Sequence, residues 1–240
     1  VLRALELAYP HRVDEVAFRD GDWALRVADT WFYWAGGRLL PEEDRTRVDE
    51  FDPYPFYAYP AELASVPTYT TEQKRAIERL VTAIDRDPPR RHPGFMSALW
   101  RVSNRATSYD RQKTTFFLGL KTMVHRELLE DLAAVEETII ERSRTDAELA
   151  SYIRTIRSIE GYNYRRVDGT ATLSNHSYGI AVDFLPTSYR SLQVYWRWAQ
   201  ASGLEWYTVP NERRYLIPDS FVEAFEAHGS VLGVAETLDN

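Results

Sequence analysis

Three prolines at positions 53, 55 and 60 separate the first part of the chain from the rest. Proline fixes its own φ angle and donates no backbone hydrogen bond, so neither a helix nor a central strand tolerates this spacing. The stretch FDPYPFYAYP (51–60) is therefore expected to be an extended connector that carries several aromatic rings. Packing of these rings against the domain is the favoured interpretation, and a recognition surface for peptide or glycan is the alternative.

The chain before this connector has the pattern of short antiparallel strands. A turn sequence, Asp20-Gly21, separates two short runs in which apolar residues alternate with other residues. A glycine pair at 36–37 follows a further apolar run. We predict a small β-meander over residues 13–40.

After the connector, apolar residues recur at steps of three and four, which is typical of amphipathic helices. Helices are predicted from a capping box at Thr70-x-x-Gln73 through about 84, then at roughly 95–104, 117–142, 145–156, 189–201 and 218–228. The longest of these carries Leu120, Val124, Leu128, Leu132, Val135 and Ile139. Beyond Gly161, the segments YNYRRV (162–167) and IAVDF (180–184) are expected to be strands.

These patterns predict an α+β fold. Its parts are an N-terminal β-meander, a helical middle, and a small antiparallel sheet in the C-terminal half that carries a metal cleft. We expect two domains. The first is a β-rich extension over residues 1–66, and the second is an α+β domain over residues 67–240.

Composition excludes some kinds of site. The formal net charge of −7 argues against an electrostatic grip on nucleic acid, and no apolar run is long enough for a transmembrane helix. The chain has no cysteine, so neither a disulfide nor a thiolate metal site can form. A metal ion would have to be bound by histidine and carboxylate side chains.

Such side chains occur together in LSNHSYGIAVDF (173–184). In a strand, Asp183 and Ala181 would point away from the core, and His176 would lie on the loop just before it. A loop histidine and a strand carboxylate can bind one cation, and both donor types suit zinc. A solvated histidine and a carboxylate that caps a neighbouring turn would give the same bare spacing.

The fuller pattern is more specific. Ser174-x-His176-x-x-Gly179-x-Ala181-x-Asp183 matches all five fixed positions of the motif S-x-H-x-x-G-x-A-x-D. It resembles the D-Ala-D-Ala carboxypeptidase-like metallopeptidases of family M15, which include VanY-like enzymes and L-alanyl-D-glutamate endopeptidases. The resemblance covers roughly residues 110–230 and also takes in GYNYRRVDGT just upstream.

The resemblance implies roles for individual residues. His176 and Asp183 would be two of three protein ligands to a catalytic Zn²⁺, and Ser174 would contact the substrate near its terminal carboxylate. An upstream arginine would bind the substrate or polarise its carbonyl, with Arg165 preferred and Arg166 as the alternative, because an arginine fork suits a carboxylate or an oxyanion. The implied partner is a peptidoglycan stem peptide or a similar D-amino-acid peptide, in a periplasmic or extracellular location.

The third ligand and the general base are missing from the pattern. The family places them late in the chain, as a Glu or Asp two or three residues before a His. The branch that this sequence most resembles has D-x-x-H-x-E there, whereas this sequence continues from EAHG as SVLGVAETLDN. No other residue matches, since Thr208 stands where the E-x-W-H version of the motif has histidine. Other candidates for the third ligand are weaker. Four histidines have simpler explanations, namely His228, His125, His11 and His92. Two carboxylates in the C-terminal tail, Glu236 and Asp239, have no specific support.

Three explanations compete for this gap. The C-terminus is truncated or altered relative to its relatives, the protein has lost catalysis and kept a groove, or another residue completes the site. The leading prediction is a zinc-dependent carboxypeptidase or endopeptidase that hydrolyses D-amino-acid-containing cell-wall peptides, and the gap leaves open whether the activity of this chain is full or impaired. The alternative is a non-catalytic peptidoglycan- or peptide-binding module derived from the same fold.

Overall fold

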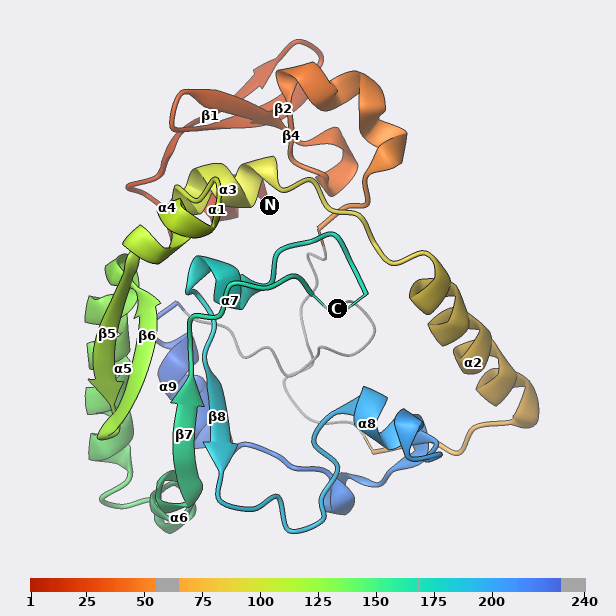
Figure 1. Cartoon of the computed structure of the whole chain (residues 1–240), viewed down its shortest axis with the longest axis vertical. Helices are drawn as coiled ribbons and strands as arrows, with labels where there is room; N and C mark the ends of the chain where they lie inside the picture. Colours follow the sequence, from red (N-terminus) through yellow and green to blue (C-terminus); the bar gives the residue numbers. More distant parts are fainter. Residues whose placement is uncertain (55–64, 168, 230–240) are drawn as a thin grey trace.

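The computed structural model describes residues 1–54, 65–167 and 169–229. It shows a mixed α+β architecture in which an antiparallel sheet is followed by helices and then by two small antiparallel sheets (Figure 1). The predicted fold class is confirmed. Residues 55–60 of the proline-rich connector lie outside the described residues, so both interpretations of that stretch stay predictions.

The helices and strands have the following bounds. The α-helices are α1 (Leu2–Ala8), α2 (Thr71–Arg86), α3 (Gly94–Trp100), α4 (Arg105–Asp110), α5 (Leu129–Arg142), α6 (Ala147–Thr155), α7 (Asn175–Tyr178), α8 (Trp196–Ala201) and α9 (Asp219–Glu226). The strands are β1 (Val13–Arg19), β2 (Asp22–Val27), β3 (Thr30–Tyr33), β4 (Leu40–Pro41), β5 (Gln112–Phe117), β6 (Leu120–His125), β7 (Ile156–Glu160) and β8 (Asp183–Pro186). Among these helices, none is both long and apolar enough to cross a bilayer.

The N-terminal sheet is the predicted meander, with strand order β1-β2-β3-β4. Two-residue turns at Asp20-Gly21 and Ala28-Asp29 join its first three strands, and all four of these residues have positive φ. Such turns match the right-handed twist of a hairpin. The inner face of the sheet packs on α1 and α3, where the Phe32 and Phe95 rings meet edge to face at 5.6 Å.

The expected helix over 117–142 is wrong in its first half. Residues 112–125 form a β-hairpin, β5–β6, whose strands are joined by Leu118-Gly119, both with positive φ. Helix α5 begins only at Leu129 and packs against the hairpin (Figure 1). The i, i+4 spacing of Leu120 and Val124 is also compatible with a strand, because residues four apart lie on the same face of either element.

The sheet that carries Asp183, the last residue of the motif, is the antiparallel pair β7–β8, in which Glu160 lies opposite Asp183. Its apolar face and helices α5, α6 and α9 enclose a second core around Phe117, Ile139 and Phe221. The predicted strand at 162–167 is absent. Within this segment, only Arg166 forms a β-bridge to another described residue, and that bridge, to Leu173, is isolated. The helix predicted over 189–201 is confined to α8.

Candidate functional site

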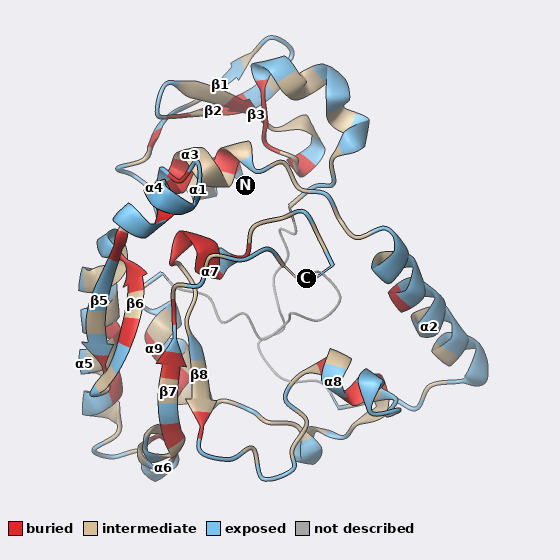
Figure 2. Ribbon diagram, viewed as in Figure 1, coloured by how far each residue is buried: buried red, intermediate tan, exposed pale blue. Residues whose placement is uncertain are grey.

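Helix α7 brings the first part of the motif to the centre of the molecule. Ser174 is its N-cap, with the Ser174 hydroxyl accepting a hydrogen bond from the His176 backbone N–H, and Gly179 ends the helix with φ of 73°. His176 therefore lies on a short buried helix instead of the predicted loop (Figure 2). Glycine suits position 179 because φ is positive there and an added Cβ would lie 2.8 Å from the backbone nitrogen of His125, besides 1.9 Å from Oε1 of Gln112.

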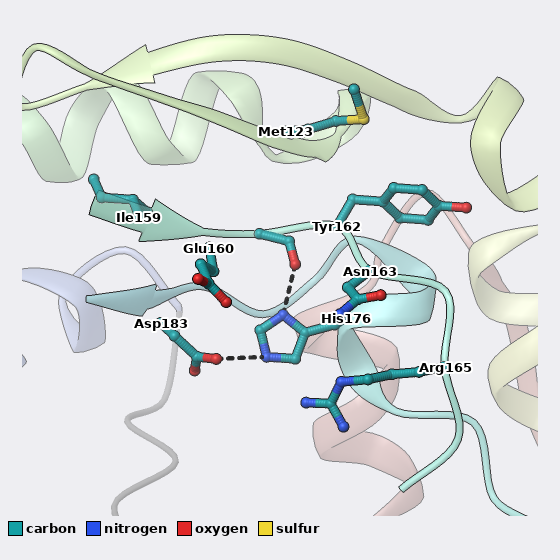
Figure 3. A pocket seen from close by; sticks show the side chains of 9 residues that line it. Met123, Ile159, Glu160, Tyr162, Asn163, Arg165, His176 and Asp183 are labelled. Atoms are coloured by element: carbon teal, nitrogen blue, oxygen red, sulfur yellow. Dashed lines mark hydrogen bonds and ion pairs between the residues drawn. The ribbon is translucent and has the colours of Figure 1, made fainter. Parts of the chain in front are cut away.

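Both ring nitrogens of His176 have an oxygen neighbour. Nδ1 lies 2.6 Å from the backbone oxygen of Gly161, and Nε2 lies 3.2 Å from Oδ2 of Asp183 (Figure 3). A carbonyl oxygen can only accept, so Nδ1 carries a hydrogen and donates it to Gly161. Nε2 of the neutral ring then presents a lone pair to the carboxylate.

Two acceptors 3.2 Å apart repel each other unless a positive species lies between them. A proton on Nε2 is one such species, and the hydrogen bond with the Asp183 carboxylate raises the pKa of His176 against the opposing effect of burial. A metal cation is the alternative, because it binds neutral imidazole and carboxylate at the same time. The hydrogen bond from Nδ1 to a backbone carbonyl is the usual way in which a metal-binding histidine is oriented.

The distance between Nε2 of His176 and Oδ2 of Asp183 is compatible with a metal ion bound by both atoms. Zn–N and Zn–O bonds of about 2.0–2.2 Å at a tetrahedral angle place the two donor atoms roughly 3.3–3.5 Å apart. The observed 3.2 Å is close to that value. However, the described part of the chain contains no group of three His, Cys, Asp or Glu side chains that could hold an ion. The structure therefore offers two donors of a metal site, and Zn²⁺ itself stays a proposal.

His176 and Asp183 line a cavity of about 350 Å³. Its other lining residues are Met123, Ile159, Glu160, Gly161, Tyr162, Asn163 and Arg165. In Figure 3 the Arg165 side chain lies beside the His176 ring on the side away from Asp183, and the positive charge of Arg165 lowers the pKa of that ring. An anionic group of a ligand in this cavity can therefore reach both a guanidinium and the His176–Asp183 pair.

The other two residues predicted to contact substrate lie elsewhere. Ser174 is buried and caps α7, and it is not among the residues that line the cavity. Arg166 donates to the backbone oxygen of Ala171 and does not line the cavity either. A substrate contact by Ser174 stays a prediction.

The remaining histidines lie away from the cavity. His125 is fully buried at the end of β6 against the Trp100 ring, and burial lowers the pKa of His125 to about 4. His92 is bonded to Asp44 at 2.9 Å, and His228 lies 3.0 Å from the Thr138 hydroxyl after α9. His11 is exposed. The predicted candidates Glu236 and Asp239 fall outside the described residues.

Sequence comparison agrees with the geometry over the C-terminal part of the chain. Residues 168–234 match a peptidase M15 family model described as D-alanyl-D-alanine carboxypeptidase. This match contains Ser174, His176 and Asp183, and it supports a peptidase-like fold for the segment. Residues 1–56 match a family model described as a domain of unknown function. Neither the search of curated proteins nor the search of solved structures found a match.

Sequence reasoning missed Glu160 as a residue of the cavity. Glu160 lies opposite Asp183 in the β7–β8 ladder, so both side chains project from the same face of the sheet. Figure 3 shows its carboxylate on the cavity wall. Only the strand pairing could have revealed this, since 23 positions separate the two residues along the chain.

Proposed function

We propose that the cavity around His176 and Asp183 is the substrate site of a zinc-dependent peptidase that acts on D-amino-acid-containing cell-wall peptides. The observation that carries the proposal is the His176 ring, whose Nδ1 is fixed by Gly161 and whose Nε2 faces Asp183 at 3.2 Å. The match of residues 168–234 to a D-alanyl-D-alanine carboxypeptidase model supports the same class of reaction.

Each residue would have a distinct task in this reaction. Nε2 of His176 and the Asp183 carboxylate would bind Zn²⁺, which when bound activates a water molecule and polarises the substrate carbonyl. Arg165 would bind an anionic group of the peptide, because a guanidinium forms two parallel hydrogen bonds with a carboxylate. The domain division at residue 66 is part of the same proposal, with the cavity belonging wholly to residues 67–240.

A second candidate is a peptide-binding module without catalysis. It is favoured by one observation: among the described residues, no group of three His, Cys, Asp or Glu side chains is placed to hold a metal ion. In this case Arg165 and the cavity would retain a peptide, and no bond would be cleaved.

Zinc analysis and peptide hydrolysis distinguish the candidates. The chain is purified without chelators, dialysed against zinc, and assayed with a peptide ending in D-Ala-D-Ala and with its L-Ala-L-Ala counterpart. About one zinc per chain and cleavage of the D-peptide, both lost in His176→Ala, support the peptidase. Peptide binding without bound zinc supports the module. No zinc and no binding of either peptide would contradict both.

A further inference from the structure

Ser177 follows His176 directly in α7 and is fully buried. Its hydroxyl accepts a hydrogen bond from the Arg165 backbone N–H at 2.8 Å and donates one to the Arg165 backbone oxygen at 2.5 Å. A hydroxyl has one hydrogen and two lone pairs, so a single side chain satisfies both backbone groups of one residue. Helix α7 thereby holds the backbone of the arginine that lines the cavity.

This contact compensates for the absence of a strand. Residues 161–165 belong to no strand or helix, so no regular ladder fixes the place of Arg165. Two further backbone contacts of the segment go to α7 and its N-cap, from Asn163 N–H to the His176 oxygen and from Ser174 N–H to the Arg165 oxygen, both at 3.1 Å, while Tyr162 N–H donates to the Met123 oxygen of β6 at 2.6 Å. Ser177 provides the side-chain part of this attachment.

Ser177 is itself held in place. Its backbone oxygen accepts a hydrogen bond of 2.5 Å from the hydroxyl of Ser108, which is also fully buried. A buried hydroxyl with all its partners on fixed backbone has little freedom to rotate, and its hydrogen bonds are costly to break. The distance between the Arg165 and His176 backbones is therefore set by short, buried contacts.

We propose that Ser177 is a positioning residue, which sets where the Arg165 side chain enters the cavity relative to His176 and Asp183. The inference rests on the proposed function, since it assumes that Arg165 binds the carboxylate of a peptide. Loss of the Ser177 hydroxyl would weaken recognition of that carboxylate. It would leave the affinity for zinc unchanged, because His176 and Asp183 keep their own contacts.

The test compares two peptides that differ only at the C-terminus. One ends in D-Ala-D-Ala with a free carboxylate and the other ends in the corresponding carboxamide, and calorimetry measures their affinities for the full chain. We expect the wild type to prefer the carboxylate by about tenfold or more, as a charge-assisted pair implies. Arg165→Ala should remove this preference, and Ser177→Ala should reduce it to about twofold. Zinc affinity should stay within about twofold in Ser177→Ala, because this change removes no charge and no contact of the His176 or Asp183 side chain.

Two controls separate positioning from a general loss of structure. Ser177→Cys leaves no cavity, and its thiol is somewhat larger and a weaker hydrogen-bonding group than the hydroxyl, so it should reduce the preference for the carboxylate as Ser177→Ala does. In the wild type, hydrogen exchange of the Arg165 amide should be strongly protected although no strand contains it. Fast exchange of that amide would overturn the inference even if neither variant folds.

The outcomes for the two proposals differ. Loss of the carboxylate preference in Arg165→Ala but its full retention in folded Ser177→Ala overturns the role of Ser177 and leaves the proposed function intact. Full retention in Arg165→Ala overturns the substrate role of Arg165 and, with it, the positioning role of Ser177.

Discussion

The imidazole of His176 and the carboxylate of Asp183 meet at 3.2 Å although they come from different elements, a buried helix and the first residue of a strand. The side chain of the histidine is 10% exposed and that of the aspartate 54%. One member of the pair is thus held rigidly, while the other faces the cavity. Such an arrangement leaves room for a cation on the exposed side without rebuilding the helix.

The first prediction concerns the exposed member of the pair. Asp183→Asn removes the negative charge but keeps the size of the side chain, so zinc affinity should fall by about 100-fold or more, since even indirect partners of metal ligands contribute 10- to 100-fold. Isothermal titration with zinc measures the effect. Asp49→Asn is the matched control, because Asp49 is exposed and lies in the N-terminal extension. Equal zinc affinity in the two variants would remove Asp183 from the site.

The second prediction concerns the glycine that ends α7. Gly179 and Gly203 have nearly equal φ, 73° and 76°, but only Gly179 is packed against other atoms. Both alanine variants incur the left-handed penalty of about 1 kcal/mol. Gly179→Ala should cost about 1–3 kcal/mol more, because its Cβ would meet Gln112 and the His125 backbone nitrogen. Urea unfolding of the two variants gives the difference, and equal destabilisation would mean that the space around Gly179 adapts without cost.

The pairing of His176 with Asp183 could be predicted from the sequence, because the full motif at 174–183 is more specific than the bare spacing of the two residues. The motif points to His176 and Asp183 as partners, whereas it does not predict the helix that carries His176 or the start of the strand at Asp183, since the sequence indicates a loop and a strand over 180–184 there. Contacts with remote segments could not be predicted. The Gly161 carbonyl that fixes the histidine and the hydroxyl of Ser177 that holds Arg165 depend on how the segment 161–165 packs on α7.

The β5–β6 hairpin shows where periodicity misleads. Its strands hold Thr114, Thr115 and Thr122, and β-branched residues favour strands over helices. The turn at Leu118-Gly119 is a second feature of a hairpin, but it is hard to recognise in the sequence. Leucine at a positive φ is uncommon, and the pair Asn-Gly that usually marks such a turn is absent. Apolar residues recur at steps of three and four through β6 and on into α5. The sequence over both elements therefore has the pattern of one long helix.

The third prediction concerns the pH dependence of stability. His125 is fully buried and its pKa is lowered to about 4, so the folded state binds fewer protons than the unfolded state between about pH 4 and 6.5. Stability from this group is complete above pH 6.5 and falls as the pH drops toward 4, by at most about 3 kcal/mol.

Unfolding in urea at several pH values checks this. The decrease should be smaller in His125→Gln, which cannot be protonated, than in the wild type. His11→Gln should keep the wild-type dependence, because His11 is exposed. A wild-type decrease that persists in full in His125→Gln would assign the titration to another group.

The last prediction concerns the core between the N-terminal sheet and the chain beyond residue 66. Phe32 and Phe95 are 2% and 3% exposed, and their rings contact edge to face. Phe32→Ala should therefore cost about 3–5 kcal/mol, and the loss should extend to α3, because the cavity left behind lies against Phe95. Phe18→Ala is the matched control. Its ring is 62% exposed and contacts only the exposed Trp23 ring among the aromatic pairs, so we expect a cost below about 1.5 kcal/mol.

Hydrogen exchange of the α3 amides reports whether this helix is destabilised together with the sheet. If Phe32→Ala destabilises residues 1–54 but leaves protection in α3 unchanged, the two segments unfold separately, as independent domains divided at residue 66 would. Faster exchange in both would show that α3 and the N-terminal sheet form one cooperative unit, which would move the domain boundary beyond α3.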